Sequence, residues 1–233
     1  MCGRFVLRTP VEELRRIFGF VEQPNLMPRY NIAPTQDVPV IRQRRNPAGE
    51  RTLQMLRWGL VPSFAEDTKG GARLINARAE SVAEKASFRA AFRRRRCLVP
   101  ADGFYEWRAE GKAKQPYLIQ RRDRGVFAFA GLWERWSPKE QGEGPAFIDS
   151  FTIVTTAANA LLRPLHERMP VILPPEAHAT WLDPDGEPGR LQALLKPAPD
   201  DWLSYAPVGT EVNAARAEGP QLVDLRGNEV IAA

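Results

Sequence analysis

Six short runs of β-branched and aromatic residues recur along this chain, each bounded by glycine, proline or aspartate. Such runs predict strands at residues 38–42, 52–61, 96–107, 115–121, 125–136 and 150–156. The predicted helices do not alternate regularly with these strands, which argues against a doubly wound parallel sheet. We therefore expect an α+β fold with a mostly antiparallel sheet.

The first predicted helix covers residues 9–19. Thr9 is placed as its N-cap, and Glu12 three residues later completes a capping box. Gly19 follows the last apolar position, as glycine commonly does where a helix ends. These signals together predict a short surface helix.

The second predicted helix covers residues 81–95, where Ser81 and Glu84 form a similar capping box. Apolar residues four positions apart mark its buried face, and cations mark its exposed face. The buried residues are Phe88 and Phe92, and the exposed cations are Lys85, Arg89 and Arg93. Two further short helices are expected at residues 175–182 and 189–195.

The other segments are consistent with a single domain over residues 1–233. Residues 137–150 are polar and glycine-rich, and they predict a long hairpin loop. The tail beyond Trp202 predicts two short strands or extended segments around residues 212–219. A chain of 233 residues is long enough to bury one large core, and one domain is the usual arrangement at this length.

The charge of the chain favours an anionic partner. Lysine and arginine number 33 and aspartate and glutamate 28, so the net charge is +5. Arginines cluster at residues 41–46, 92–97 and 119–124, and the guanidinium fork suits phosphate oxygens. The alternative is that each cluster only covers a solvated face.

The sequence carries no signal for export, a membrane span or a bound metal. No leader is evident, and no apolar run approaches the roughly 20 residues that cross a bilayer. Cys2 and Cys97 are too few for a disulfide scaffold, and with two histidines they match no standard zinc spacing. There is no glycine-rich phosphate loop or dinucleotide fingerprint. We expect a cytoplasmic or nucleoid-associated protein without metal, cofactor or membrane contact.

The two histidines differ in their surroundings. His166 lies between a proline-interrupted helical segment and a strand-like run, in irregular backbone that often carries catalytic side chains. His178 lies inside the helix predicted at residues 175–182, where a surface or packing role is expected. His166 is therefore the candidate for catalysis.

Two further motifs carry candidate polar groups. Asn76 and Arg78 occupy alternate positions, so at the end of a strand both face the same side. Glu106 stands between Tyr105 and Trp107. A carboxylate desolvated by aromatic rings has a raised pKa and can act as an acid or a base. The alternative is that Glu106 points outwards from an amphipathic strand.

The N-terminus carries an amine and a thiol on one residue once an aminopeptidase removes Met1, which the small Cys2 side chain permits. Such a 1,2-aminothiol traps an aldehyde twice: the amine forms a Schiff base, and the thiol then closes a thiazolidine on the same carbon. This closure is intramolecular, so its effective molarity is on the order of 10⁵ M or more in a favourable geometry. The alternative is that Met1 stays and Cys2 is a buried strand residue.

Two classes of function other than aldehyde capture are alternatives for a chain with these residues. An N-terminal-nucleophile peptidase or amidohydrolase would attack an acyl carbon with Cys2 and use its own amine as the base. Such an enzyme turns over small amides without DNA. A non-catalytic binder of single strands would not need Cys2, and it would leave the co-occurrence of Cys2, Asn76, Glu106 and His166 unexplained.

Six ordered motifs resemble the SRAP (SOS response-associated peptidase) family over residues 2–182. They are MCGRF, RYNIAPTQ, RWGLVPSF, LINARAES, RCLVPADGFYEW and HERMPVIL. The resemblance implies one α+β domain on a twisted, barrel-like antiparallel sheet with a basic groove. It also implies binding to single-stranded DNA and a thiazolidine crosslink between the N-terminal cysteine and an abasic site, which shields the lesion.

Carried over by position, the catalytic residues of the family fall on Cys2, Asn76, Glu106 and His166, and its DNA-contacting arginines fall on Arg4 and Arg78. A further basic contact of some members falls on Ala86, so this contact shifts to Lys85 or Arg89 or is missing. The implied partner is single-stranded DNA with abasic sites, and we expect a monomer.

The resemblance gives each residue an expected role. Glu106 would move the proton that opens the closed abasic sugar, and His166 would assist ring opening or the Schiff-base step. Asn76 would position the amine or the sugar. Trp58 or Trp107 would stack on unpaired bases if exposed, although each can equally belong to the core.

Overall fold

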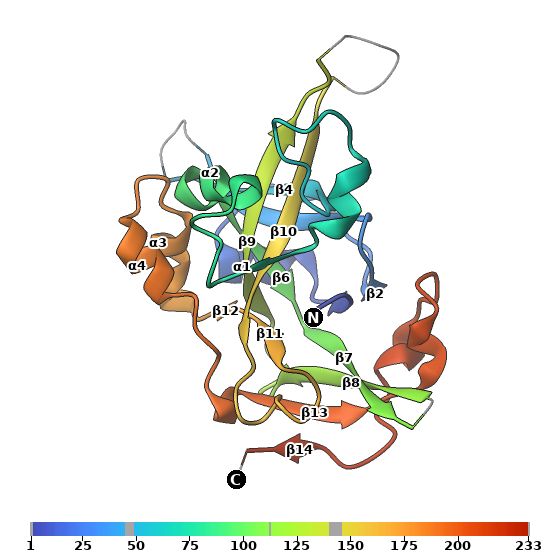
Figure 1. The fold of residues 1–233 in the computed structure, drawn as a ribbon. Helices are drawn as coiled ribbons and strands as arrows, with labels where there is room; N and C mark the ends of the chain where they lie inside the picture. Colours follow the sequence, from blue (N-terminus) through green and yellow to red (C-terminus); the bar gives the residue numbers. More distant parts are fainter. Residues whose placement is uncertain (1, 45–48, 112, 140–145, 233) are drawn as a thin grey trace.

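Two β-sheets form the centre of the molecule, and the helices lie around them (Figure 1). This computed structural model describes residues 2–44, 49–111, 113–139 and 146–232. The first sheet has six strands, in the order β14 (Val230–Ile231), β13 (Leu203–Pro207), β8 (Ala113–Arg121), β7 (Gly103–Glu110), β1 (Phe5–Leu7) and β2 (Arg29–Ile32).

The second sheet has eight strands, in the order β11 (Arg168–Pro170), β10 (Ile148–Ala157), β4 (Arg51–Trp58), β3 (Asp37–Gln43), β6 (Arg96–Ala101), β9 (Phe127–Trp136) and β12 (Ile172–Leu173), with β5 (Asn76–Arg78) paired to β10. Because β10 also pairs with β9, five strands close into a ring: β10, β4, β3, β6 and β9. Paired strands are antiparallel except where β10 runs parallel to β4 and β5. The predicted α+β class with a mostly antiparallel, barrel-like sheet is confirmed.

Aromatic side chains anchor the N-terminal strand β1 in the core. The rings of Phe5 and Trp58 lie edge to face with centroids 5.2 Å apart, a favourable arrangement for buried aromatics. Trp58 is fully buried and its Nε1 donates a 3.0 Å hydrogen bond to the carbonyl of Ile75. The suggestion that Trp58 stacks on bases is therefore wrong, and Trp58 belongs to the core.

Helix α1 (Val11–Phe18) ends as predicted but begins differently. Gly19 adopts a left-handed φ of 70°, and its N–H donates to the carbonyl of Arg15. Thr9 does not cap the helix, because its hydroxyl and backbone N–H donate to the buried carboxylate of Asp102. The capping-box prediction is wrong for this helix, since a long-range partner takes the capping group.

Helix α2 (Ala86–Arg94) begins later than predicted. The carbonyl of Ser81 accepts from the N–H groups of Glu84 and Lys85, so the chain makes turns here first, and Val82 packs into the core. No side chain caps the helix, so this capping box is also wrong. Its two faces are confirmed, with buried Phe88 and Phe92 and exposed Lys85, Arg89 and Arg93.

The two late helices are confirmed as α3 (His178–Leu182), which follows a 3₁₀ turn at Pro175–Ala177, and α4 (Pro188–Ala193). Strands β9 and β10 are antiparallel neighbours, which confirms the hairpin between them, although residues 140–145 of its loop lie outside the described residues. The tail prediction is confirmed in part. Beyond Trp202 the chain has two short strands, β13 and β14, but they lie on either side of residues 212–219, which contain no strand. Two 3₁₀ helices, at Thr210–Asn213 and Pro220–Val223, lie between these strands.

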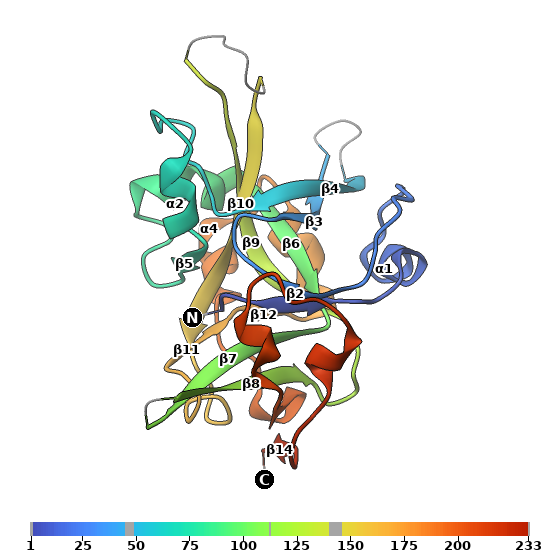
Figure 2. The same ribbon diagram turned by 90° about the vertical axis from the view of Figure 1, so that its right-hand side faces the viewer.

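The helices of the described part of the chain are all too short or too polar to cross a membrane. Helix α2 and strand β5 lie on the same side of the molecule as the N-terminus, at the left of Figure 2, whereas α1 lies on the opposite side. Helix α2, which carries the exposed cations Arg89 and Arg93, therefore lies on the side where the chain begins.

Candidate functional site

Cys2 lies three residues before the start of β1, and its side chain is fully buried. Its backbone carbonyl accepts a 2.8 Å hydrogen bond from Nδ2 of Asn76. Asn76 begins β5, and pairing with Ile153 of β10 fixes its place. Oδ1 of Asn76 is buried and has no hydrogen-bond partner among the described residues. Asn76 therefore holds the backbone of Cys2 and keeps one acceptor unused.

Glu106 lies close to the thiol. Burial raises the pKa of the Cys2 thiol well above its usual range, and the negative charge of Glu106 raises it further. Glu106 is only 5% exposed, so the alternative that it points outwards from an amphipathic strand is wrong. A buried carboxylate and a buried, protonated thiol thus share one site.

The aromatic neighbours of Glu106 do not enclose it. Adjacent residues of a strand face opposite sides, and the rings of Tyr105 and Trp107 lie together with centroids 6.3 Å apart. The Tyr105 hydroxyl donates to the carbonyl of Tyr30 at 2.8 Å, and Nε1 of Trp107 donates to Oδ1 of Asn213 at 2.7 Å. Desolvation of Glu106 by its two flanking aromatics is therefore the wrong explanation for its burial.

His166 is half-buried in the turn before β11. Its Nδ1 accepts a 2.9 Å hydrogen bond from the backbone N–H of Arg168, so the neutral ring carries its proton on Nε2. The Arg168 guanidinium binds the Glu80 carboxylate at 2.6 and 3.0 Å and the Thr155 carbonyl at 2.7 Å. These contacts join the His166 turn to the residues that follow β5, the strand that carries Asn76.

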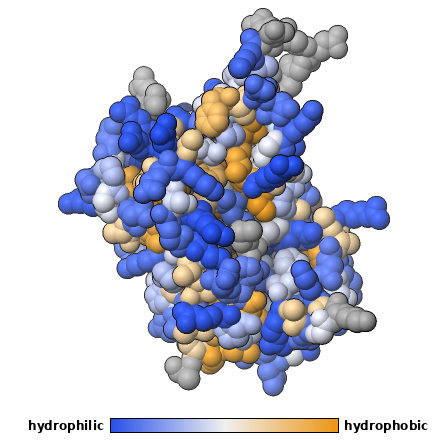
Figure 3. Space-filling model, viewed as in Figure 1, coloured by the Kyte–Doolittle hydropathy of each residue, from blue (hydrophilic) through white to orange (hydrophobic). Residues whose placement is uncertain are grey.

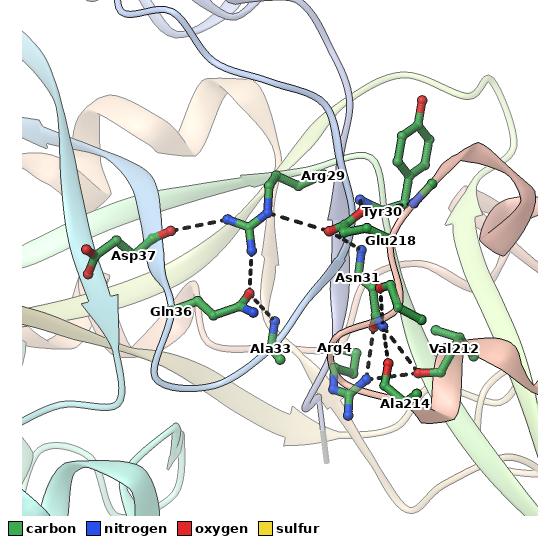
Figure 4. A network of polar contacts seen from close by, with 12 residues as sticks. Arg4, Arg29, Tyr30, Asn31, Ala33, Gln36, Asp37, Val212, Ala214 and Glu218 are labelled. Carbon is green, nitrogen blue, oxygen red and sulfur yellow. Dashed lines mark hydrogen bonds and ion pairs between the residues drawn. The ribbon is translucent and has the colours of Figure 1, made fainter.

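Arg4 is half-buried and bound on one side by the protein itself. Its Nη1 donates to Oδ1 of Asn31 and to the carbonyl of Val212, both at 2.9 Å (Figure 4). Burial lowers the pKa of Arg4 from its usual value. Asn31 and the segment around Val212 were not identified from the sequence as parts of the site, although Asn31 lies inside the motif RYNIAPTQ.

The other predicted DNA contacts are exposed cations. Arg78, Lys85 and Arg89 reach the surface, and none forms an ion pair with a described acidic residue. Hydrophilic side chains cover α2 on the face drawn in Figure 3. This side of the molecule therefore presents exposed cations without close ion pairs to described acidic residues, although Arg78 lies near the carboxylate of Glu80.

A second group of arginines is neutralised instead. It lines a cavity of about 610 Å³ that includes residues of β3, β4 and β9. Each member is paired with a carboxylate: Arg42 and Arg135 with Asp149, Arg44 with Glu22, and Arg95 with Glu134. The arginine cluster at residues 41–46 therefore contributes at least two of its members to structure rather than to a basic surface.

The polar groups around Cys2 do not form a metal site. Within the part of the chain that the structure describes, no three histidine, cysteine, aspartate or glutamate side chains are placed to hold a metal ion. The second histidine, His178, is buried, and its ring stacks on Phe18 with centroids 5.6 Å apart. His178 therefore has the packing role expected of it.

Comparison with known proteins agrees with this geometry. The profile of the family described as "SOS response associated peptidase (SRAP)" matches residues 1–215. The chain is 40% identical over 229 residues to the abasic site processing protein YoqW of Bacillus subtilis, covering 96% of this chain and 99% of that one. It is 30% identical over 233 residues to the abasic site processing protein YedK of Escherichia coli, covering 96% and 99%.

Similarity also extends to a vertebrate protein and to a solved structure. The chain is 30% identical over 262 residues to the abasic site processing protein HMCES of Xenopus tropicalis, covering 95% of this chain and 77% of that one. A crystal structure of a protein from Bacteroides thetaiotaomicron superposes with a TM-score of 0.85 at 27% identity, covering 96% and 99%. With this fold, these motifs and this extent of similarity, the chain belongs to the SOS response associated peptidase family.

Proposed function

We propose that this protein captures abasic sites in single-stranded DNA through Cys2, after Met1 has been removed. The observation that carries this proposal is the joint placement of Asn76 on the Cys2 carbonyl and of Glu106 near the thiol. The names of the relatives support the substrate, since YoqW, YedK and HMCES are all called abasic site processing proteins.

The chemistry would proceed in two condensations at one carbon. The α-amine of Cys2 attacks the aldehyde carbon of the opened sugar, and water leaves to give an imine. The sulfur then bonds to the same carbon, the C=N electron pair moves to nitrogen, and the thiol proton ends on that nitrogen. The product is a thiazolidine that links the protein to DNA and shields the lesion from strand cleavage during the response to DNA damage.

The neighbouring groups suit the proton movements of this sequence. An abasic sugar is mostly closed, and Glu106 can carry the proton from its hydroxyl to the ring oxygen as the ring opens. Because the neutral ring of His166 carries its proton on Nε2, it can donate a hydrogen bond to an oxygen that gains negative charge. The free acceptor of Asn76 can orient an N–H of the amine.

Binding would rest on phosphate contacts. Arg4, Arg78, Lys85 and Arg89 supply cations on the side of the N-terminus, which predicts affinity for DNA with little base preference. A single strand is favoured, since the sugar must reach a residue that begins inside the fold. Half-buried Trp107 remains a candidate for stacking on a base. We propose that the protein acts as a monomer in the cytoplasm, at the nucleoid.

The test is incubation of the processed protein with a single-stranded oligonucleotide that carries one abasic site. Denaturing electrophoresis and intact mass should show a crosslinked species for the wild type and none for Cys2→Ala. Cys97→Ala is the matched control, because Cys97 is an equally buried thiol elsewhere in the core, and it should crosslink like the wild type. Equal crosslinking by Cys2→Ala would refute the proposal.

The same preparation tests the rival function. An N-terminal-nucleophile peptidase or amidohydrolase would cleave small amides in the absence of DNA and would form no aldehyde adduct. Intact mass of the purified protein settles the common premise, because loss of one methionine exposes the amine of Cys2.

A further inference from the structure

Asn31 is a buried side chain with every polar group in use. It is 1% exposed and lies in β2, which pairs with β1, the strand that follows Cys2. Its Oδ1 accepts from Nη1 of Arg4 at 2.9 Å, and its Nδ2 lies within hydrogen-bond distance of three backbone carbonyls. These carbonyls belong to Val212, Ala214 and Ala217, at 3.4, 3.0 and 3.0 Å.

The segment that supplies these carbonyls is fixed to the sheet at several points. The Glu218 carboxylate accepts from the backbone N–H groups of Tyr30 and Asn31 at 2.8 and 3.3 Å. Val212 packs in a small apolar cluster with Tyr105 of β7. Residues 212–218 therefore form a wall of backbone and side chains beside Arg4 (Figure 4).

The two hydrogen bonds of Arg4 determine which of its donors remain. A guanidinium has five N–H groups, two of them on each terminal nitrogen. Both hydrogens of Nη1 are taken by Asn31 and Val212. Nε and Nη2 keep three hydrogens without a partner among the described residues, and these form the fork that binds two oxygens of one phosphate.

We infer that Asn31 is a positioning residue for DNA binding: together with the Val212 carbonyl it holds Arg4 so that its free edge meets a backbone phosphate. The inference rests on the proposed function for the ligand, and it concerns affinity rather than the covalent step. Without the Asn31 side chain, Arg4 loses one anchor, and the wall at residues 212–218 loses one of its attachments to β2.

The experiment is a double-mutant cycle on undamaged single-stranded oligonucleotide, so that its outcome does not depend on crosslinking. Asn31→Ala should weaken binding about 5- to 10-fold, as expected for the loss of one hydrogen bond of ordinary strength. In the Arg4→Ala background the same change should have less than a twofold effect, because the residue it positions is gone. An equal loss in both backgrounds would overturn the inference.

Arg4→Lys tests the same point without touching Asn31. An ammonium has three donors, so occupying Asn31 and Val212 leaves one for a phosphate. Affinity should fall about threefold or more although the charge is retained, whereas affinity equal to the wild type would overturn the inference. This variant keeps the question decidable if Asn31→Ala does not fold.

Glu218→Ala is the control for a general effect of the wall. Glu218 holds the same segment but does not contact Arg4. Affinity should stay within twofold of the wild type, and a loss as large as that of Asn31→Ala would contradict a role through Arg4. The wild type could bind undamaged strands, and Asn31→Ala could weaken that binding only when Arg4 is present, while no adduct with abasic DNA forms. In that case the proposed function fails and the role of Asn31 stands.

Discussion

At the scale of single residues, Glu106 acts on Cys2 in two opposite ways. Its charge holds the pKa of the thiol up, which disfavours thiolate, yet a carboxylate beside the thiol can accept its proton as sulfur attacks. The residue types of this site follow from the sequence motifs. The burial of Glu106 and the Asn76 bond to the Cys2 carbonyl do not, because they depend on the pairing of β5 with β10 and on the depth of β7.

Glu106→Gln should therefore separate chemistry from binding. Without a group to carry the proton, crosslinking to abasic DNA should slow by about 100-fold, within the usual range for general acid–base catalysis. Affinity for undamaged single strands should stay within twofold, since glutamine has nearly the same shape. Rates from quenched time courses and binding by fluorescence anisotropy check this, and a joint loss of both would make Glu106 a structural residue.

A second carboxylate, Glu22, makes stability depend on pH. Burial alone would raise the pKa of Glu22, but hydrogen bonds from Thr52, the N–H of Leu53 and Arg44 outweigh it and lower the pKa to about 2. A folded-state pKa below the usual 4.5 adds stability above pH 4.5, and that stability is lost as the pH falls from about 4.5 to about 2.

Glu22→Gln should accordingly destabilise the protein by about 1–2 kcal/mol at pH 7 after allowance for solvent screening. The gap between wild type and variant in urea unfolding should narrow steadily below pH 4.5. Glu187→Gln is the comparison, because Glu187 is an exposed helix cap with a smaller effect expected. A gap that does not change with pH would show that the Glu22 charge does not matter.

At the scale of elements, local signals predicted where helices exist but not how they begin. The predicted start of α1 was wrong because the Thr9 hydroxyl donates to Asp102 instead of capping the helix. The predicted start of α2 was wrong because Val82 packs into the core before the helix begins. Both interactions depend on residues distant in sequence or on packing in the core, and a local capping pattern carries no information about either. By contrast, the prediction that α1 ends at Gly19 was correct, since the left-handed conformation at a helix end is a local requirement.

The contact between Gly59 and Gly71 gives an element-scale prediction. Gly59 has a φ of 126°, and a Cβ there would lie 2.7 Å from the carbonyl oxygen of Gly71. The backbone near Gly71 leads directly into β5 and Asn76. Gly59→Ala should therefore destabilise the protein by about 2–4 kcal/mol through strain and overlap and should slow crosslinking as well.

Gly70→Ala is the matched control for this prediction, because a Cβ at Gly70 meets no atom within 4 Å. Thermal unfolding and crosslinking rates should match those of the wild type. Equal stability of Gly59→Ala and Gly70→Ala would show that the close approach of the two loops is unimportant.

At the scale of the whole molecule, the arrangement of charge divides the arginines into two groups. Antiparallel character and peripheral helices follow from strand spacing in the sequence. Ring closure through β10 and its parallel pairing with β4 and β5 do not, since they join segments about 70 to 100 residues apart. That closure decides which arginines meet carboxylates and which remain free on the side of the N-terminus.

Affinity for single strands should thus fall steeply with salt. Four phosphate contacts predict a slope of about −3 in a plot of log affinity against log salt, at roughly −0.7 for each contact. Arg78→Ala and Arg89→Ala should each reduce the slope by about 0.7, whereas Arg95→Gln should leave it unchanged because Glu134 already neutralises Arg95. Equal effects from all three would contradict the division.

The pairing of β1 with β7 also determines when, during synthesis of the chain, the N-terminal strand can complete its place in the sheet. Phe5 pairs with Phe104, so during synthesis the first strand lacks one of its two neighbours until about a hundred residues have followed it. At about 5–20 residues per second, that interval lasts roughly 5 to 20 s. Cys2 is fully buried once the sheet forms, so the removal of Met1 that we propose should take place mainly while the chain is still on the ribosome. The reactive amine would then exist before the protein that uses it is complete.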